Sequence, residues 1–235
     1  MGLKTATVAA LLWSAAASCW AETPTTGPTP AVTATGSSQL LAQLEAVQKK
    51  VDALGLKTAH VHFVESADGH RRVELGLLVA DHPPLADLLD HLEGTLGLEI
   101  LSLRIDDDFS QIEAQLTYAA AAGRTAGSTP KPGARVAVGR VVRDVAGRLV
   151  WRKQLREGAK VDRFVAKRLL LSPDGQLVLQ GFVTELGALT RLVAGMESSP
   201  LYERVEPTGI QLRSSGKLEI QETGVSARLR PQRGR

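Results

Sequence analysis

The side chains best suited to metal or acid–base chemistry include five histidines, and all of them lie in the first half of the sequence: His60, His62, His70, His82 and His91. His60 and His62 are two residues apart in a segment that reads as a strand, so both point to one side, a geometry that can hold a metal ion. The sequence offers no cysteine to join them, because its only cysteine is residue 19. It shows no dense cluster of histidines and carboxylates either. We therefore expect no metal site and no cofactor.

Two other patterns are weaker candidates for chemistry. The acidic run Asp106-Asp107-Asp108 could hold a calcium ion, but solvation alone explains an acidic turn between two strands. The serines fall in turns and lack the Gly-x-Ser-x-Gly setting that activates a nucleophile. The sequence therefore predicts no catalytic residues and a protein that is not an enzyme.

The elements that position these residues follow a pattern that occurs twice. Residues 73–118 read as strand, helix, strand and strand, and residues 177–229 read in the same order. Alternating apolar residues mark the strands, and apolar residues three and four apart mark the helices. The helical stripe of the second copy is Leu186, Leu189, Leu192, Val193 and Met196. Two copies of one small unit suggest a protein that positions other proteins.

Residues before the first copy complete a domain. An apolar stripe over residues 40–54 predicts a helix that ends at Gly55, and Thr58 to Val64 reads as a strand. The fold class is therefore α+β: two ferredoxin-like αββαββ domains in tandem, each with an antiparallel sheet and helices on one face. Residues 135–156 fit a helix by symmetry. Gly139 and Gly147 favour a hairpin, because glycine costs about 1 kcal/mol in a helix interior.

The N-terminal segment has the layout of a secretory signal peptide. Lys4 precedes an apolar run over residues 8–17, and Cys19-Trp20-Ala21 is a candidate cleavage site. The run is short for a membrane span, which needs about 20 apolar residues. We expect a periplasmic protein; an uncleaved inner-membrane anchor and a lipid attached at Cys19 remain alternatives.

The predicted organisation has six parts. They are a signal peptide (1–21), a disordered Thr/Pro/Gly linker (22–37), a first domain (38–122), a linker (123–134), a second domain (135–230) and a basic tail (231–235). Each domain is long enough to form a core of its own, and no disulfide is available to the mature chain.

The two domains carry opposite net charge. Residues 37–122 hold 6 lysines and arginines against 14 aspartates and glutamates, a net charge of −8. Residues 123–235 hold 21 against 10, a net charge of +11. Such domains could attract each other or opposite patches on neighbouring copies, and solvated surfaces explain the asymmetry equally well. Few aromatic residues are interleaved with the basic stretch from residue 135 to 168, so we expect no nucleic-acid partner.

Residues 177–229 resemble the periplasmic domain of PilN-type proteins of the type IV pilus inner-membrane alignment complex, which have relatives in the type II secretion platform. The resemblance lies in a strand that ends near Gly181, the helical stripe already given, an exit over residues 196–202 and Val205 on the next strand. The first domain resembles the related PilO-type domain in its αββαββ order. The family also carries a cytoplasmic N-terminus, a membrane helix and a coiled coil, which are not evident here.

The resemblance implies a non-enzymatic structural component of type IV pilus biogenesis or type II secretion. It would act through protein-protein interaction with homologous alignment-complex proteins, or as a homodimer, close to the inner membrane. We expect the interaction residues to lie on the second helix and last strand of the second domain: Leu186, Leu189, Val193, Leu218, Ile220 and Val225. A BON-like pair of domains that binds lipid or envelope through the basic face is the alternative.

Overall fold

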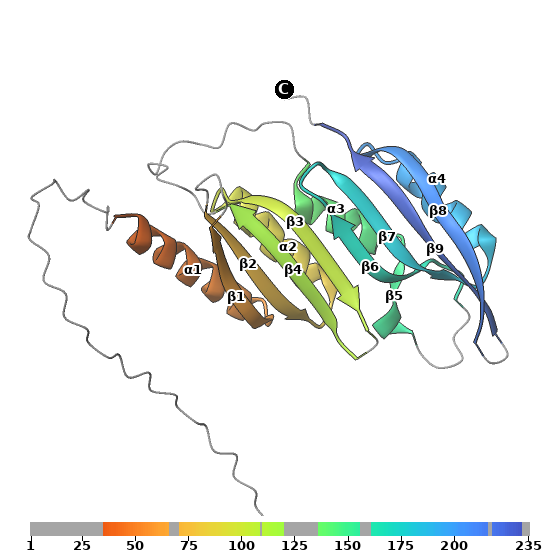
Figure 1. The fold of residues 1–235 in the computed structure, drawn as a ribbon, viewed down its shortest axis with the longest axis horizontal. Coiled ribbons are helices and arrows are strands. Elements are labelled where there is room, and N and C mark those ends of the chain that lie inside the picture. Colours follow the sequence, from red (N-terminus) through yellow and green to blue (C-terminus); the bar gives the residue numbers. More distant parts are fainter. Residues whose placement is uncertain are drawn as a thin grey trace, which may run out of the picture. The chain divides into compact units, whose positions relative to one another are not determined.

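The computed structural model describes residues 35–65, 71–108, 110–119, 136–155, 161–215 and 218–231. The chain divides into two units, residues 1–33 and 34–235, and every described residue belongs to the second. These residues form four α-helices and one nine-stranded sheet, an α+β fold (Figure 1). The predicted signal peptide and the predicted linker at 123–134 lie outside the described residues. The linker predicted over 22–37 extends too far, because a helix already begins at Thr35.

The first half of the fold follows the predicted order. Its elements are α1 (Thr35–Ala53), β1 (Lys57–Glu65), β2 (Arg71–Val79), α2 (His82–Gly94), β3 (Glu99–Asp107) and β4 (Ile112–Ala119). Beyond the end of α1, Gly55 has a φ of 68°, a conformation that glycine adopts without strain. At the start of α2, the Asp81 carboxylate accepts a hydrogen bond of 2.8 Å from the His82 backbone N–H. The strand order is β1-β2-β4-β3.

The second half repeats this order with one insertion. Its elements are α3 (Val138–Ala146), β5 (Val150–Trp151), a 3₁₀ turn (Arg152–Gln154), β6 (Val165–Leu171), β7 (Gln176–Val183), α4 (Leu186–Glu197), β8 (Tyr202–Ser215) and β9 (Leu218–Leu229). The structure decides the open question at 135–156 for the helix, because Val138, Val141, Val142 and Val145 form one buried stripe. The short β5 then pairs in parallel with β6. The strand order is β6-β7-β9-β8.

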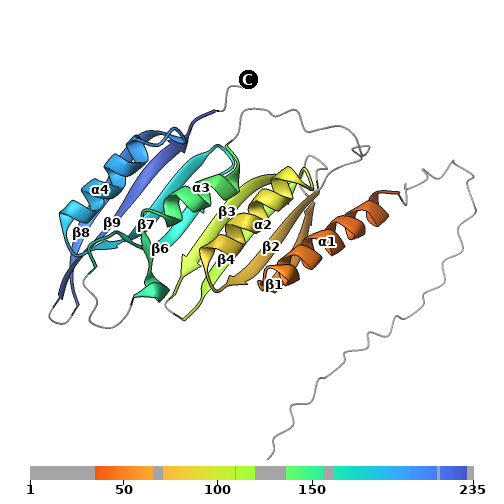
Figure 2. The same cartoon turned by 180° about the vertical axis from the view of Figure 1, so that it is seen from behind.

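The sequence predicted two sheets, and this was wrong: the strands form a single sheet. Its order is β1-β2-β4-β3-β6-β7-β9-β8, because β3 pairs antiparallel with β6 from Leu103↔Leu171 to Asp106↔Arg168. The paired parts of both strands would otherwise be free edges, and pairing satisfies their backbone groups at a place where Leu103 and Leu169 are buried. All four helices cover one face of this sheet (Figure 2). One hydrophobic core runs between the helices and the sheet.

Candidate interaction surface

The contact between the two halves, which we call the seam, consists of β3 against β6 and α2 against α3. On the open face of the sheet, Asp106 of β3 accepts hydrogen bonds from Arg104 on its own strand and from Arg168 on β6. Partial burial opposes ionisation of this carboxyl group, but the two arginines outweigh it and lower the pKa of Asp106. A salt bridge therefore joins the halves across the strand pair.

Asp107 differs from the solvated acidic turn that the sequence predicted. Its side chain is buried, and Oδ2 accepts a hydrogen bond of 2.7 Å from the backbone N–H of Lys153. Asp106 and Asp107 both belong to β3 rather than to the turn. Solvation was the wrong explanation for these two carboxylates, because they bind groups from the second half of the chain. Asp108 alone keeps a turn role, and it accepts from the N–H of Ser110 and Gln111.

The helices approach closely on the other side of the sheet. The guanidinium of Arg143 on α3 binds Asp87, at 2.6 Å, and Asp90, both on α2. Gly139 allows this approach, since a Cβ atom there would meet the Asp90 side chain and lie 2.7 Å from the backbone oxygen of Ala86. The helix pair and the strand pair together make the seam a packed interface with polar contacts at its rim.

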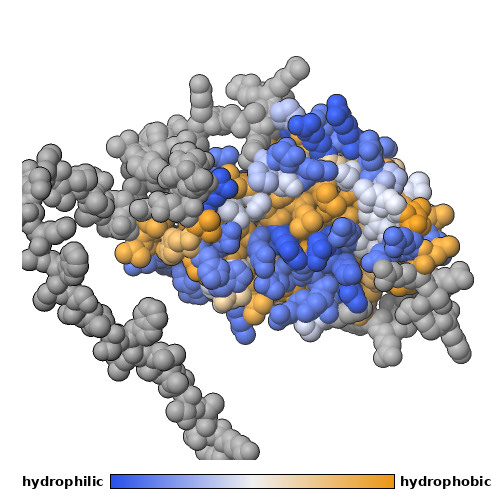
Figure 3. All heavy atoms as spheres, in the orientation of Figure 1, coloured by the Kyte–Doolittle hydropathy of each residue, from blue (hydrophilic) through white to orange (hydrophobic). Residues whose placement is uncertain are grey.

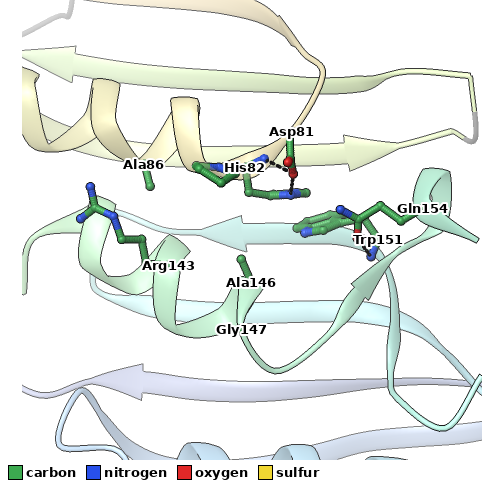
Figure 4. Close-up of a pocket in the computed structure, with 9 residues that line it drawn as sticks. Asp81, His82, Ala86, Arg143, Ala146, Gly147, Trp151 and Gln154 are labelled. Carbon is green, nitrogen blue, oxygen red and sulfur yellow. Dashed lines mark hydrogen bonds and ion pairs between the residues drawn. The ribbon is translucent and has the colours of Figure 1, made fainter. Parts of the chain in front are cut away.

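A cavity of about 330 Å³ opens at the seam between α2, α3 and β5 (Figure 4). The rings of His82 and Trp151 stack in its wall, with centroids 4.4 Å apart. Burial lowers the pKa of His82 to about 4, so this imidazole is neutral at pH 7. His82 Nε2 and Trp151 Nε1 have no hydrogen-bond partner among the described residues. Both atoms are themselves buried.

His60 and His62, for which we expected no metal site, both lie on β1. The rings of His60 and His62 are 5.0 Å apart and tilted by 36°. The His60 ring occupies the space above Gly76 on β2 that a Cβ atom would fill. Among the described residues, no group of three or more histidine, cysteine, aspartate or glutamate side chains could hold a metal ion.

The strand registers of the two halves correspond over much of their length. Two residues separate the end of β2 at Val79 from the start of α2 at His82, and two separate Val183 from Leu186 in the second half. The β1–β2 ladder shifts register between Thr58 and His60, and the β6–β7 ladder shifts at the matching place, between Ala166 and Arg168. On this basis Val61 corresponds to Leu169, Phe63 to Leu171, and Ile210 of β8 to Ile105 of β3.

This correspondence allows the exposure of apolar residues on the outer strands to be compared with that at the seam. At the seam, Ile105, Leu169 and Leu171 are 0%, 1% and 6% exposed. Their counterparts on the outer strands, Ile210, Val61 and Phe63, are 51%, 36% and 55% exposed. Leu186 begins α4 as His82 begins α2, and it is 50% exposed where His82 is buried. The outer strands thus expose the apolar positions that the seam buries.

All the exposed large apolar side chains of the described residues lie at the two ends of the sheet. We call α1 and β1 the β1 end, with Leu41, Val61, Phe63 and Val64, and we call α4 and β8 the β8 end, with Leu186, Ile210 and Leu212. In Figure 3 hydrophobic surface appears at both ends and in the middle of the sheet, surrounded by hydrophilic surface. These two groups of exposed apolar side chains are the candidate interaction surfaces.

The two outer strands differ in how they present their edges. β8 contains Pro207 and shifts register twice, and Arg204 and Gly209 have positive φ angles of 52° and 53°. Proline and bulges on an edge strand limit pairing with other chains. β1 contains no proline and shifts register once, near its start. Its edge is open over residues 60–65.

The six predicted interaction residues lie in different environments, and some of them are buried. Leu186 is exposed and Val193 is half-buried, whereas Leu189 packs in the core. On β9, Ile220 is half-buried and the side chain of Leu218 lies outside the described residues. Val225 is fully buried, and β9 lies between β7 and β8, so this predicted interaction residue does not lie on the surface. The first half has the same arrangement, because its last strand, β4, lies between β2 and β3.

Comparisons with known proteins were made at three levels. No family model, no curated protein and no solved structure matches this chain. Within the described residues, no helix has both the length and the apolar character required to cross a membrane.

Proposed function

We propose that this protein is a non-enzymatic structural component of a type IV pilus or type II secretion assembly, and that it works in the periplasm through protein-protein contacts. The proposal takes the two halves as ferredoxin-like domains of the αββαββ type. Their strand orders, β1-β2-β4-β3 and β6-β7-β9-β8, support this, because a ferredoxin-like sheet whose chain starts at a helix would have the same order. The resemblance of residues 177–229 to PilN-type domains is the reason for naming a type IV pilus or type II secretion assembly.

The observation that carries the proposal is the exposure of seam-equivalent residues at both ends of the sheet. Val61, Phe63 and Ile210 occupy positions whose counterparts are buried where the two halves meet. The seam itself is an association of two such domains through their edges. A protein that keeps these positions apolar while they face water is suited to bind further domains of the same kind.

Gene deletion in the producing cell tests this role. We expect loss of pilus-dependent motility or of secretin-dependent secretion, and restoration by the wild-type gene. Phe63→Lys should fail to restore it, because a charge at the open edge blocks docking. Gln115→Lys is the matched control, since Gln115 is exposed in the centre of the sheet, away from both ends.

Two results would contradict the proposal. A deletion strain with normal motility and normal secretion removes the assembly role. Binding of the purified protein to anionic lipid vesicles, together with an envelope defect that Phe63→Lys corrects as well as wild type, favours the BON-like alternative.

A further inference from the structure

We propose that neighbouring copies of this chain join head to tail, with the β8 end of one copy docked on the β1 end of the next. This contact would repeat the seam between copies, with β8 in the place of β3 and β1 in the place of β6. The inference deepens the proposed function, because it names a second copy as the occupant of the same surface.

The register of the seam determines which residues meet. Within the chain, Ile105 lies opposite Leu169 and Asp106 opposite Arg168. The corresponding pairs between copies are Ile210 with Val61 and Gln211 with His60. Ile210 and Val61 are branched aliphatic residues, which pack well as cross-strand neighbours. Glutamine and histidine replace the seam's salt bridge with groups that can hydrogen-bond.

The helices would repeat the seam as well. There α2 packs against α3, so α4 of one copy would pack against α1 of the next. Leu186, at the start of α4, is 50% exposed and corresponds to His82, which lies by the end of α3 in the seam. Burying Leu186 with Val61, Phe63 and Ile210 removes four of the seven exposed large apolar side chains from water.

The seam distinguishes this arrangement from a symmetric dimer. It joins β3 to β6, which are the counterparts of β8 and β1, and it pairs no strand with its own equivalent. Charged side chains balance at each end: α1 and β1 carry three acidic and three basic residues, and so do α4 and β8. The apolar side chains and the strand register therefore direct the contact.

Pro207 limits the strength of the contact. It stands at the position of Leu103 in the seam, and it pairs with Val225 of β9 while lacking an N–H group. A proline in such a strand turns its nitrogen toward the open side, so the edge of β8 lacks one ladder donor. We therefore expect association that is weaker than the seam and reversible. Because the contact joins two different surfaces, a dimer still has one free end of each kind and adds further copies.

Sedimentation velocity of the protein, purified in the form that producing cells contain, tests the inference. From 1 to 200 µM we expect the wild type to grow continuously beyond a dimer. Phe63→Lys and Ile210→Lys should each remain monomeric alone. Their equimolar mixture should form a dimer that grows no further, because only the intact β8 end of the first and the intact β1 end of the second remain. Pro207→Leu should lower the dissociation constant about fivefold, the equivalent of one hydrogen bond.

Folding controls keep the result interpretable. Both lysine variants replace side chains that are more than half exposed, and circular dichroism and thermal unfolding should match the wild type. Phe63→Thr and Ile210→Thr serve if either lysine variant is unstable. Gln115→Lys should associate as the wild type does.

Three outcomes would overturn the inference: a wild type that is monomeric at 200 µM, association that saturates at a dimer, and loss of association in Phe63→Lys alone. The last indicates pairing of two β1 strands. A monomeric wild type whose Phe63→Lys variant still fails to restore assembly in cells overturns self-association and leaves the proposed function with a different partner. Conversely, continuous growth of the wild type in sedimentation, together with a deletion strain of normal motility and secretion, supports self-association and overturns the proposed function.

Discussion

The carboxylate of Glu93, at the end of α2, accepts a hydrogen bond of 2.8 Å from the backbone N–H of Val138, the first residue of α3. Ala137 precedes α3 and has no side chain that could cap it. A residue of the first half therefore satisfies a free N–H group at the start of the second half. Burial raises the pKa of Glu93 to about 7, although the hydrogen bond from Val138 opposes this shift. The seam thus contains a group that titrates near neutral pH.

The first prediction is that Glu93 makes stability fall as pH rises. The folded protein holds the Glu93 proton up to about pH 7, whereas the unfolded chain releases it near pH 4.5. The stabilisation is complete below pH 4.5 and is lost as pH rises through 7, by about 1–3 kcal/mol. Glu93→Gln keeps an acceptor for Val138 and should remove this decline, as measured by urea unfolding at pH 5 and pH 8. Glu197→Gln, at the matching place on α4, should leave the decline unchanged. An unaltered slope in Glu93→Gln contradicts the assignment.

Local patterns predicted much of the fold, because they act over one helix or one turn. The apolar stripes located α1, α2 and α4, and Gly55 marked the end of α1. The β3–β6 pairing has no such local signal, since it joins strands about 60 residues apart. Without that pairing, Asp106 and Asp107 read as a solvated turn. The open edge at β1 became visible only when the buried counterparts of Val61 and Phe63 were known.

The second prediction concerns the close contact of α2 and α3 at Gly139. Gly139→Ala should destabilise the protein by about 1–3 kcal/mol, because the new methyl group meets Asp90 and the backbone of Ala86. Gly187→Ala on α4 is the matched control. Its methyl group would approach only the flexible end of Arg191, at 3.4 Å. There alanine should be neutral or stabilising by up to about 1 kcal/mol. Chemical unfolding measures both, and equal effects would show that helix propensity alone governs these sites.

The third prediction concerns the salt bridge between Asp106 and Arg168. The pKa of Asp106 is lowered, so the carboxylate stabilises the fold above its ordinary value of 3.8, and this contribution is lost as pH falls through the lowered pKa. The side chains of Arg168 and Asp106 are 36% and 28% exposed, so solvent screens part of the attraction and Asp106→Asn should cost only about 0.5–1 kcal/mol at pH 7. A double-mutant cycle with Arg168→Gln measures the coupling. Zero coupling would mean that Arg104 alone stabilises Asp106.

The last prediction is that the seam holds the two halves together after the expected linker at 123–134 has been cut. Limited proteolysis should cut between Gly123 and Gly133 and give two fragments, because that stretch has the composition of an accessible linker. The β3–β6 ladder, the α2–α3 packing and the Glu93–Val138 hydrogen bond do not depend on the intact linker. The two fragments should therefore elute together from a gel-filtration column and separate in about 2 M urea, before either unfolds completely. Adding Gly139→Ala should lower the urea concentration at which they separate, whereas Gly187→Ala should not. Fragments that separate without denaturant would show that the halves are held together only by the chain, and a chain that resists cutting would place the linker within the folded core.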